Sequence, residues 1–334
     1  MTTASGTDRA RAVGRVIVVL TIVAALLAPV LGPHGPGDQY SGLLNAPPTR
    51  PHSVGDDGRW HQPFIYRWRL VDRLEQRYEE DRSARVPLNW FARGHLVSSS
   101  DDARAPLMLL GADSFGRDVW SRLLFGARAS LGIAIVAALG AVFLGAMVGG
   151  FAGYAGGAAD DLLMRGTDFI MVLPAMYVVL ALRAVLPLVL APATVFLLLT
   201  GIFAIVGAPF MARGVRAIVR TERDLDYSTA ARALGASDAR VVFRHLLPAA
   251  RGFIGVEMTL LVPAFVVAEA TLSYIGLGFP DPIASWGTML HDASNVRVFV
   301  DFPWLLSPAL AMFTVVLGLN LTLQGSATGV ESMR

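Results

Sequence analysis

The residues of this chain that could carry chemistry are acids placed inside apolar sequence. Glu257 and Glu269 lie in one long apolar run, twelve residues apart. Ionisable side chains in lipid are costly and usually face a cavity, a partner or an interface. On a helix this separation turns the two side chains roughly 120° apart. We therefore expect these acids, together with Ser273, to serve helix packing or to line a solute path, and not to form an acid–base pair.

The composition excludes several classes of enzyme. All 28 basic residues are arginines, so neither a GxxxxGK[ST] phosphate-binding loop nor a kinase lysine is present. No HExxH or GxSxG motif occurs, and cysteine is absent. We predict no catalytic residue and no metal site in this chain. We interpret the histidines without metal-ligand spacing as surface or packing residues: His34, His52, His61 and His95.

The composition is instead that of an integral membrane protein. Hydrophobic residues make up 54% of the 334 residues and charged residues 16%, and the apolar residues fall in long blocks. A helix needs roughly 20 apolar residues to cross a bilayer. We predict an all-α fold with about six transmembrane helices, at 16–32, 129–159, two within 169–212, 252–272 and 304–323. Arg183, with Pro187 and Pro192 close by, marks the turn between the third and the fourth.

The arginines orient these helices. Arg9, Arg11 and Arg15 precede the first one, which places the N-terminus in the cytoplasm. Six spans then place both termini inside, and the eight arginines of 213–251 fall in a cytoplasmic loop, as the positive-inside rule requires. A cleaved signal peptide is the alternative for the first helix, but a proline follows its best cleavage site. The net charge of +2, without an aromatic-interleaved basic face, argues against nucleic-acid binding.

Two stretches between the predicted helices have their own patterns. The run 129–159 is rich in glycine and alanine, which allow close helix packing in a membrane, and Asp160 and Asp161 after it are expected in a short surface loop. In the external segment, Leu70, Leu74 and Tyr78 recur every four residues beside opposite charges, which predicts an amphipathic helix. Half of the six tryptophans lie in this segment and form either a small core or a docking surface for a partner: Trp60, Trp68 and Trp90.

A short basic stretch, YSTAARALGASDARVVFRHLLPAA, separates two apolar runs at 227–250. Asp226 or Ser228 can cap a first helix, and Gly235 ends it. Ser237 can cap a second helix, which is expected to end before Pro248. Two short helices joined at a glycine are too short to span a membrane. Such a unit is suited to fill a groove in a soluble partner.

This stretch resembles the EAA loop of the permease subunits of ABC importers. The family pattern is EAA, three residues, Gly, nine residues, an apolar position, one residue and Leu-Pro. Two positions depart from it, because Thr229 replaces the usual Glu and His245 replaces a frequent Ile. The resemblance implies a loop that couples to an ATPase through these residues: Thr229, Ala230, Ala231, Arg232, Gly235, Ala236, Ser237, Arg244, His245, Leu247 and Pro248.

Further matches resemble the dipeptide, oligopeptide and nickel branch of this family, and its C-type permease. His245 is common there. The stretch LGADSFGRDVWSRLLFGARASL resembles its GRD segment, with Gly116, Arg117 and Asp118, and EATLSYIGLGFPDPIASWGTML resembles a segment after the fifth helix. The external segment is longer than usual, and the C-terminal tail differs. The substrate is therefore open, and nickel, glutathione and peptide antibiotics are alternatives to peptides.

The resemblance implies the subunit of an importer in the bacterial cytoplasmic (inner) membrane. Its expected partners are a second permease, two ABC ATPases that bind the ATP and Mg, an extracellular or periplasmic solute-binding protein and membrane lipid. A membrane scaffold or sensor without an ATPase is the alternative of another class. The expected domains are a cytoplasmic tail (1–14), a first transmembrane helix (15–32), a periplasmic segment (33–109), an amphipathic GRD segment (110–128), a permease core of five transmembrane helices (129–325, coupling loop 213–251) and a cytoplasmic tail (326–334).

Overall fold

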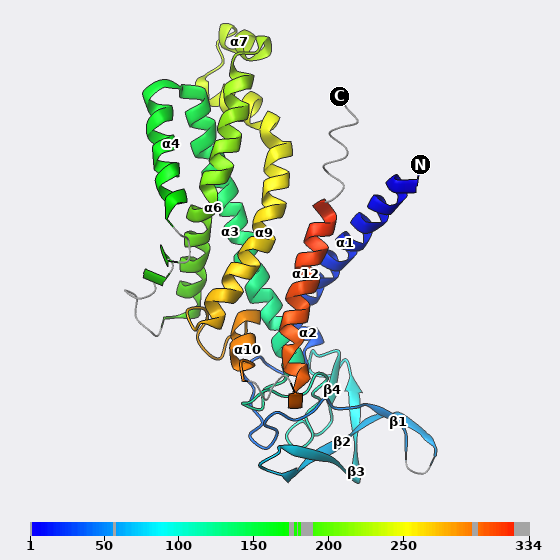
Figure 1. Ribbon diagram of the computed structural model, residues 1–334. Helices are drawn as coiled ribbons and strands as arrows, with labels where there is room; N and C mark the ends of the chain where they lie inside the picture. The colour runs from blue at the N-terminus through cyan, green and yellow to red at the C-terminus, as the bar shows by residue number, and fades with distance from the viewer. Residues whose placement is uncertain are drawn as a thin grey trace. The chain divides into compact units, whose positions relative to one another are not determined.

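The computed structural model describes residues 2–55, 58–173, 177–178, 180–181, 190–295 and 300–323. The chain divides into two compact units (Figure 1). The helical unit comprises 1–14, 132–269 and 319–334, and the mixed unit comprises 15–131 and 270–318. Four helices have residues in both units, namely α1 (Thr2–Leu26), α3 (Val119–Ala155), α9 (Arg251–Tyr274) and α12 (Ser307–Leu323).

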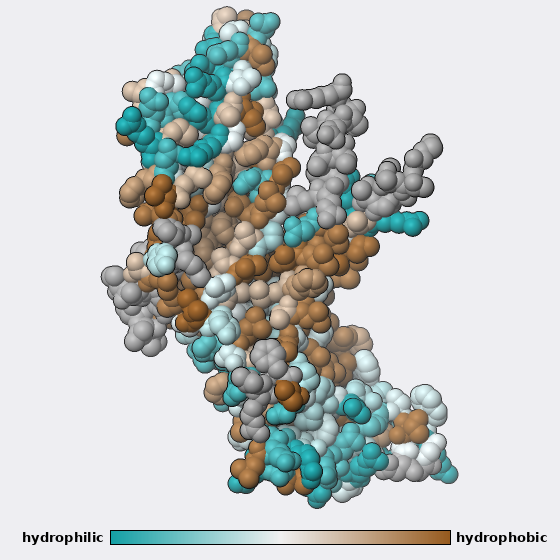
Figure 2. Space-filling model, viewed as in Figure 1, coloured by the Kyte–Doolittle hydropathy of each residue, from teal (hydrophilic) through white to brown (hydrophobic). Residues whose placement is uncertain are grey.

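The helical unit is a bundle in which α3 and α9 pack with α4 (Gly157–Val172) and α6 (Pro192–Arg223). Between α6 and α9 the chain forms α7 (Asp226–Ala233), α8 (Asp238–Val241), a π turn η1 (Val242–Leu246) and a 3₁₀ turn η2 (Leu247–Ala250). Figure 2 shows hydrophobic residues along the flanks of this bundle and hydrophilic ones gathered around α7 and the adjacent end of α4. That distribution is typical of helices that lie in lipid and end in water.

Four helices within the described ranges are long and apolar enough to cross a membrane: Val119–Ala155, Pro192–Arg223, Asp238–Tyr274 and Pro303–Thr322. They coincide with four of the six predicted spans. The first predicted span is helical, as α1 (Thr2–Leu26) and α2 (Ala28–Leu31), but its apolar part is shorter. The third predicted span falls partly on α4, and Arg183 and Pro187 lie outside the described residues. The count of six therefore stays a prediction.

Glycines on α3 allow its backbone to approach α6 closely. A Cβ atom on Gly149 would lie 2.2 Å from the Ala212 carbonyl oxygen, and one on Gly145 would lie 2.5 Å from the Met211 Cβ. The same contact repeats one turn further on, where a Cβ on Gly153 would lie 2.8 Å from the Arg216 carbonyl oxygen. A seam of small residues is how helices pack tightly where no hydrophobic effect drives them together. The packing role predicted for this run is confirmed.

The prediction of a surface loop at Asp160 and Asp161 is wrong. Both residues lie in α4, and Asp160 is only 4% exposed. Its carboxylate pairs with Arg216 of α6, whose Nη2 donates to Oδ2 at 2.5 Å. The Gly156-Gly157 pair turns the chain back after α3 with both residues at positive φ, and thereby places α4 against α6. The partner of this acid could not be predicted from local sequence, because Arg216 is 56 residues away.

The mixed unit contains a four-stranded antiparallel sheet among its described residues, so the predicted all-α class is wrong for this segment. The strands are β1 (His52–Val54), β2 (Trp60–Asp72), β3 (Arg77–Trp90) and β4 (Val97–Ser99), in the order β1-β2-β3-β4. The amphipathic helix predicted here is instead the β2–β3 hairpin. A spacing of four residues keeps side chains on one face of a strand as well as of a helix.

The turn chemistry of the hairpin explains why the strand conformation prevails. Asp72 Oδ1 accepts hydrogen bonds from the backbone N–H groups of Leu74 and Glu75, and Gln76 takes the left-handed conformation at φ 51°. This reverses the chain, so Leu70 pairs with Tyr78 across the strands. Leu74 is left at the tip, 85% exposed. An aspartate that caps its own turn favours reversal over a continuous helix.

The mixed unit is completed by α1 from Arg15 onward, α2, α10 (Trp286–Asp292), η3 (Pro303–Leu306) and the first part of α12 (Ser307–Leu323). One core beneath the sheet is formed by Ile65, Leu88, Ala105 and Leu107. A second core joins α10 to the start of α3 and is formed by Val119, Met289, Ala293, Phe302 and Leu305. Trp286 is 1% exposed, and its Nε1 donates to the Leu123 carbonyl at 3.1 Å. These contacts fix α10 beside the first turns of α3.

Candidate functional site

The segment 226–248 forms two short helical pieces joined at a glycine. α7 ends at Ala233, and Gly235 follows at φ 84°, a left-handed conformation that only glycine adopts without strain. The expected hinge is therefore in place. The expected caps are not, because neither Leu225, the N-cap of α7, nor Ser237, the N-cap of α8, makes a side-chain capping hydrogen bond.

The second piece does not end before Pro248, as the sequence predicted, but continues into α9. The helical path runs without interruption from Asp238 to Tyr274. Proline lacks an N–H group and clashes with the preceding turn of an α-helix. Here the clash is avoided because a π turn and a 3₁₀ turn, η1 and η2, replace regular helix around Pro248. A displacement of α8 is thus passed directly to α9.

The inner side of the second piece is packed against α6. Val241, Leu246 and Ala250 are fully buried, in a cluster with Met211, Val215 and Val219 of α6. Tyr154 at the end of α3 donates a short hydrogen bond to the Asp238 carboxylate. Arg223 Nη1 in turn donates to the Tyr154 carbonyl at 3.0 Å. The base of the loop is therefore fixed to two long helices.

The first piece, α7, presents its end to solvent. Leu234, the C-cap of α7, is 89% exposed, so a large apolar side chain meets solvent at the end of this helix. Arg232 is exposed beside it and binds back through Nη2 to the Arg223 carbonyl at 3.2 Å. The Thr229 hydroxyl donates to the Asp226 carbonyl at 2.9 Å, within its own turn. Thr229 therefore uses its hydroxyl within its own turn and has no carboxylate like that of the Glu in the family pattern.

The other predicted loop residues divide by burial. Ala230, Gly235, Ser237 and Arg244 are exposed, whereas Ala231, Ala236, His245, Leu247 and Pro248 are half-buried. Among the half-buried residues, Ala236 and Leu247 pack against the buried cluster at the base of the loop. The structure thus brings the predicted loop residues together in one compact unit, and its exposed apolar tip is the part available to a partner.

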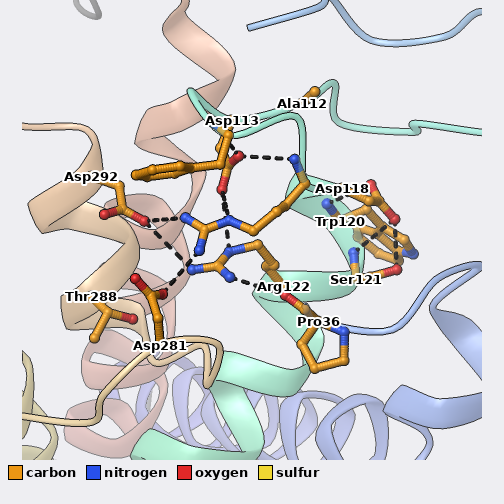
Figure 3. Close-up of polar contacts among 12 residues, drawn as sticks. Pro36, Ala112, Asp113, Asp118, Trp120, Ser121, Arg122, Asp281, Thr288 and Asp292 are labelled. Carbon is orange, nitrogen blue, oxygen red and sulfur yellow. Dashed lines mark hydrogen bonds and ion pairs between the residues drawn. The ribbon is translucent and has the colours of Figure 1, made fainter. Parts of the chain in front are cut away.

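A second constellation surrounds the predicted GRD segment in the mixed unit (Figure 3). Arg117 is 1% exposed and pairs with three carboxylates. Its Nε lies 2.6 Å from Asp113 Oδ2, its Nη1 lies 3.0 Å from Asp281 Oδ1, and its Nη2 lies 2.6 Å from Asp292 Oδ2. Arg122, equally buried, lies 3.5 Å from the same oxygens of Asp113 and Asp292. Two arginines facing three aspartates tie α10 and the loop before it to the start of α3.

The third residue of the segment, Asp118, belongs to an adjoining network. Its Oδ2 accepts a hydrogen bond from the Ser121 hydroxyl at 2.6 Å and lies 3.1 Å from His34 Nδ1. The other ring nitrogen of His34 lies 3.0 Å from Asp102, which also accepts from the Tyr40 hydroxyl at 2.7 Å. Burial lowers the pKa of His34, but hydrogen bonds and charge from the two aspartates outweigh it and raise the pKa to about 9. His34 is therefore charged and completes a buried ion cluster.

The backbone conformation and the close packing at position 116 both require glycine. Its φ is 77°, and a Cβ there would lie 2.2 Å from the Tyr40 carbonyl oxygen. The glycine thus lets the turn close onto the chain at Tyr40. Sequence reasoning found Gly116, Arg117 and Asp118 but missed His34, Arg122, Asp281 and Asp292. Their signal in the sequence is weak, because each partner lies on a distant segment.

The predicted path residues lie along α9. Glu269 is fully buried and Glu257 is half-buried. Ser273 is 1% exposed in the last turn, where a Cβ on Gly287 would lie 2.6 Å from its Cβ. This close approach favours the packing alternative for Ser273. For the two glutamates, both alternatives stay open.

The fold and these sites define a class. Long apolar helices, with an arginine-rich loop that is packed at its base and exposed at its tip, are the form of a multi-pass membrane subunit that works with soluble partners. The chain belongs to the family of binding-protein-dependent transport system inner membrane components, whose model matches residues 141–332, more than half of the chain. It is thus a permease subunit of a binding-protein-dependent importer.

Curated relatives agree with this family. The chain is 37% identical to the oligopeptide transport system permease protein OppC of Bacillus subtilis over 64% of this chain and 68% of that protein. It is 41% identical to the dipeptide transport system permease protein DppC of the same organism, over 54% of this chain and 55% of that protein. It is 35% identical to the glutathione transport system permease protein GsiD of Pectobacterium atrosepticum, over 64% of this chain and 68% of that protein.

Proposed function

We propose that this permease subunit forms, with a second permease, a path for peptide-like solutes. The names of the relatives, which include oligopeptide, dipeptide and glutathione permeases, support this substrate class. Glutathione is itself a small peptide, so it remains a specific alternative within the class. Nickel and peptide antibiotics, which the sequence left open, have no such support among these relatives. Family membership also favours transport over a scaffold or sensor.

The coupling of this subunit to ATP hydrolysis is placed in segment 226–248. The supporting observation is the contrast between its base, where Val241 and Leu246 are fully buried, and its tip, where Leu234 is 89% exposed. An exposed apolar residue on a loop whose base is firmly packed is suited to a hydrophobic groove. The grooves belong to two cytoplasmic ATPase subunits, which bind ATP and Mg. Closure of the ATPases then moves α8, and the continuous helix carries that motion into α9.

Solute selection is assigned to an extracytoplasmic binding protein. The helix α9, with Glu257 and Glu269, is proposed to line the solute path. We place both termini in the cytoplasm. With six spans this orientation also puts the basic segment 213–251 in the cytoplasm, where the positive-inside rule favours arginines. The ion cluster around Arg117 belongs to the mixed unit and follows the predicted external segment 33–109 in the chain. Its role is to keep the start of α3 and α10 in one fixed geometry.

The test is co-purification of the chain with its ATPase subunits. Leu234→Glu places a charge on the exposed tip and is expected to lower the recovered ATPase at least severalfold, with no loss of folded permease. Leu74→Glu is the matched control, because Leu74 is 85% exposed but lies on the hairpin of the mixed unit. Equal ATPase recovery with both variants would contradict the assignment of the loop. Mass spectrometry of the solute bound to the assembled importer tests the substrate class separately.

A further inference from the structure

The turn between β3 and β4 exposes two large aromatic side chains. Trp90, the last residue of β3, is 55% exposed, and Phe91 is 78% exposed. Phe91 and Arg93 take the left-handed conformation, at φ 52° and 54°. Bulky residues rarely adopt this region, and such strain persists only where the surrounding structure holds it. The turn is therefore held in a shape that presents its aromatic side chains outward.

This turn is fastened to the end of the first helical segment. The Leu96 N–H donates to the Val30 carbonyl at 2.7 Å, and His95 Nδ1 lies 2.7 Å from the Gly32 carbonyl oxygen. The Phe91 N–H donates to the Leu96 carbonyl at 3.0 Å, which closes the turn. The exposed aromatic side chains are thus held at the level of the C-terminal end of α2.

That level is where the apolar surface of α1 and α2 ends. Seven large apolar side chains on this surface are 41–65% exposed: Val16, Val19, Leu20, Val23, Leu26, Leu27 and Val30. In water such a surface would be unfavourable, whereas lipid covers it at no cost. At the end of α2, Trp120 Nε1 of α3 donates to the Leu31 carbonyl at 3.1 Å. A candidate membrane helix therefore begins beside the point where the apolar run of α1 and α2 ends.

We propose that the turn Trp90–Arg93 inserts into the headgroup layer of the membrane and anchors the sheet to the lipid surface. Trp and other amphipathic side chains favour this layer, and the exposed Arg93 provides a cation for lipid phosphates. The occupant is lipid and not a protein, because the turn is hydrogen-bonded to Val30 and Gly32, where the exposed apolar surface of α1 and α2 ends. The proposal does not depend on the transported solute or on the coupling loop.

The absence of cysteine from the chain makes the test direct. Phe91→Cys is spin-labelled in the full chain, assembled with its importer partners in vesicles of phosphatidylethanolamine and phosphatidylglycerol. Collision rates of the label are measured with oxygen, which partitions into lipid, and with a water-soluble nickel chelate. Leu74→Cys is the matched control. Leu74 is 85% exposed at the tip of the β2–β3 hairpin, ahead of β3, whereas position 91 follows the other end of that strand.

The expected result is a ratio of oxygen to nickel collisions severalfold higher at position 91 than at position 74. Equal ratios would place the turn in water and overturn the proposal. Suppression of both kinds of collision at position 91 would show a protein partner on the turn and overturn it as well. Trp90→Cys serves as a second labelled variant, because its backbone does not need the left-handed conformation and it is expected to fold where Phe91→Cys does not.

Discussion

Arg117 and Asp292 are 175 residues apart in the sequence, yet the guanidinium Nη2 of one lies 2.6 Å from the carboxylate of the other. Burial raises the pKa of Asp292, and the charges of Arg117 and Arg122 oppose this rise. The two arginines thus limit the rise in pKa that burial causes. Because Arg117 is also bound to Asp113 and Asp281, one side chain holds three separate segments of the mixed unit together.

Arg117→Met is therefore expected to be strongly destabilising. It leaves the buried Asp113 and the half-buried Asp292 without their main counter-charge, and breaking a buried pair in this way costs roughly 3–5 kcal/mol. Asp281→Asn is the control, because the Asp281 side chain is 72% exposed and an exposed pair contributes about 1 kcal/mol or less. Thermal unfolding in detergent measures both. Similar losses for the two variants would show that burial does not decide the stability of this cluster.

The histidine of the adjoining network gives the mixed unit a dependence on pH. The pKa of His34 in the folded protein, about 9, lies above its ordinary value of 6.5, so folding favours the protonated form. The resulting stability, on the order of 3 kcal/mol, is fully present below pH 6.5 and is lost as the pH rises through 9. His34→Gln should remove this slope between pH 6.5 and 9. The test is to measure the melting temperature of the wild-type protein and of the His34→Gln variant across that pH range. Parallel plots of melting temperature against pH would refute the role of His34.

How far the sequence predicts this structure depends on whether the determining contact is local. The hinge at Gly235 and the apolar helices follow from residue type and from runs of neighbouring residues. The hairpin does not, because Leu70, Leu74 and Tyr78 satisfy a helix and a strand equally, and the turn at Asp72 decides between them. The GRD segment could be predicted from the sequence, but its contacts with His34 and Asp292 could not. Such partners are brought together by tertiary folding, which no local pattern records.

A glycine in the seam between α3 and α6 and a glycine outside it, in α4, should respond in opposite ways to replacement by alanine. Gly149→Ala places a methyl group 2.2 Å from the Ala212 carbonyl oxygen, so the helices must separate, at a cost of roughly 1–3 kcal/mol. Gly166 in α4 has no heavy atom within 4 Å of a Cβ. Gly166→Ala should therefore stabilise slightly, by roughly 0.5–1 kcal/mol, through helix propensity. Unfolding by denaturant compares the two, and a stable Gly149→Ala variant would disprove the tight contact.

The neighbouring acids of α4 provide a matched pair. Asp160 is 4% exposed and accepts two hydrogen bonds from Arg216, whereas Asp161 is exposed. Hydrogen bonds to charged groups contribute roughly 1.5–3 kcal/mol, so Asp160→Asn should destabilise the helical unit by about that amount. Asp161→Asn should change its stability by less than about 0.5 kcal/mol. Both variants remove one negative charge from the same turn, so general electrostatics affects them equally. A difference in melting temperature therefore reports the ion pairs of Asp160 with Arg216 and Arg220 of α6, and equal melting temperatures would mean that these pairs do not hold α4 to α6.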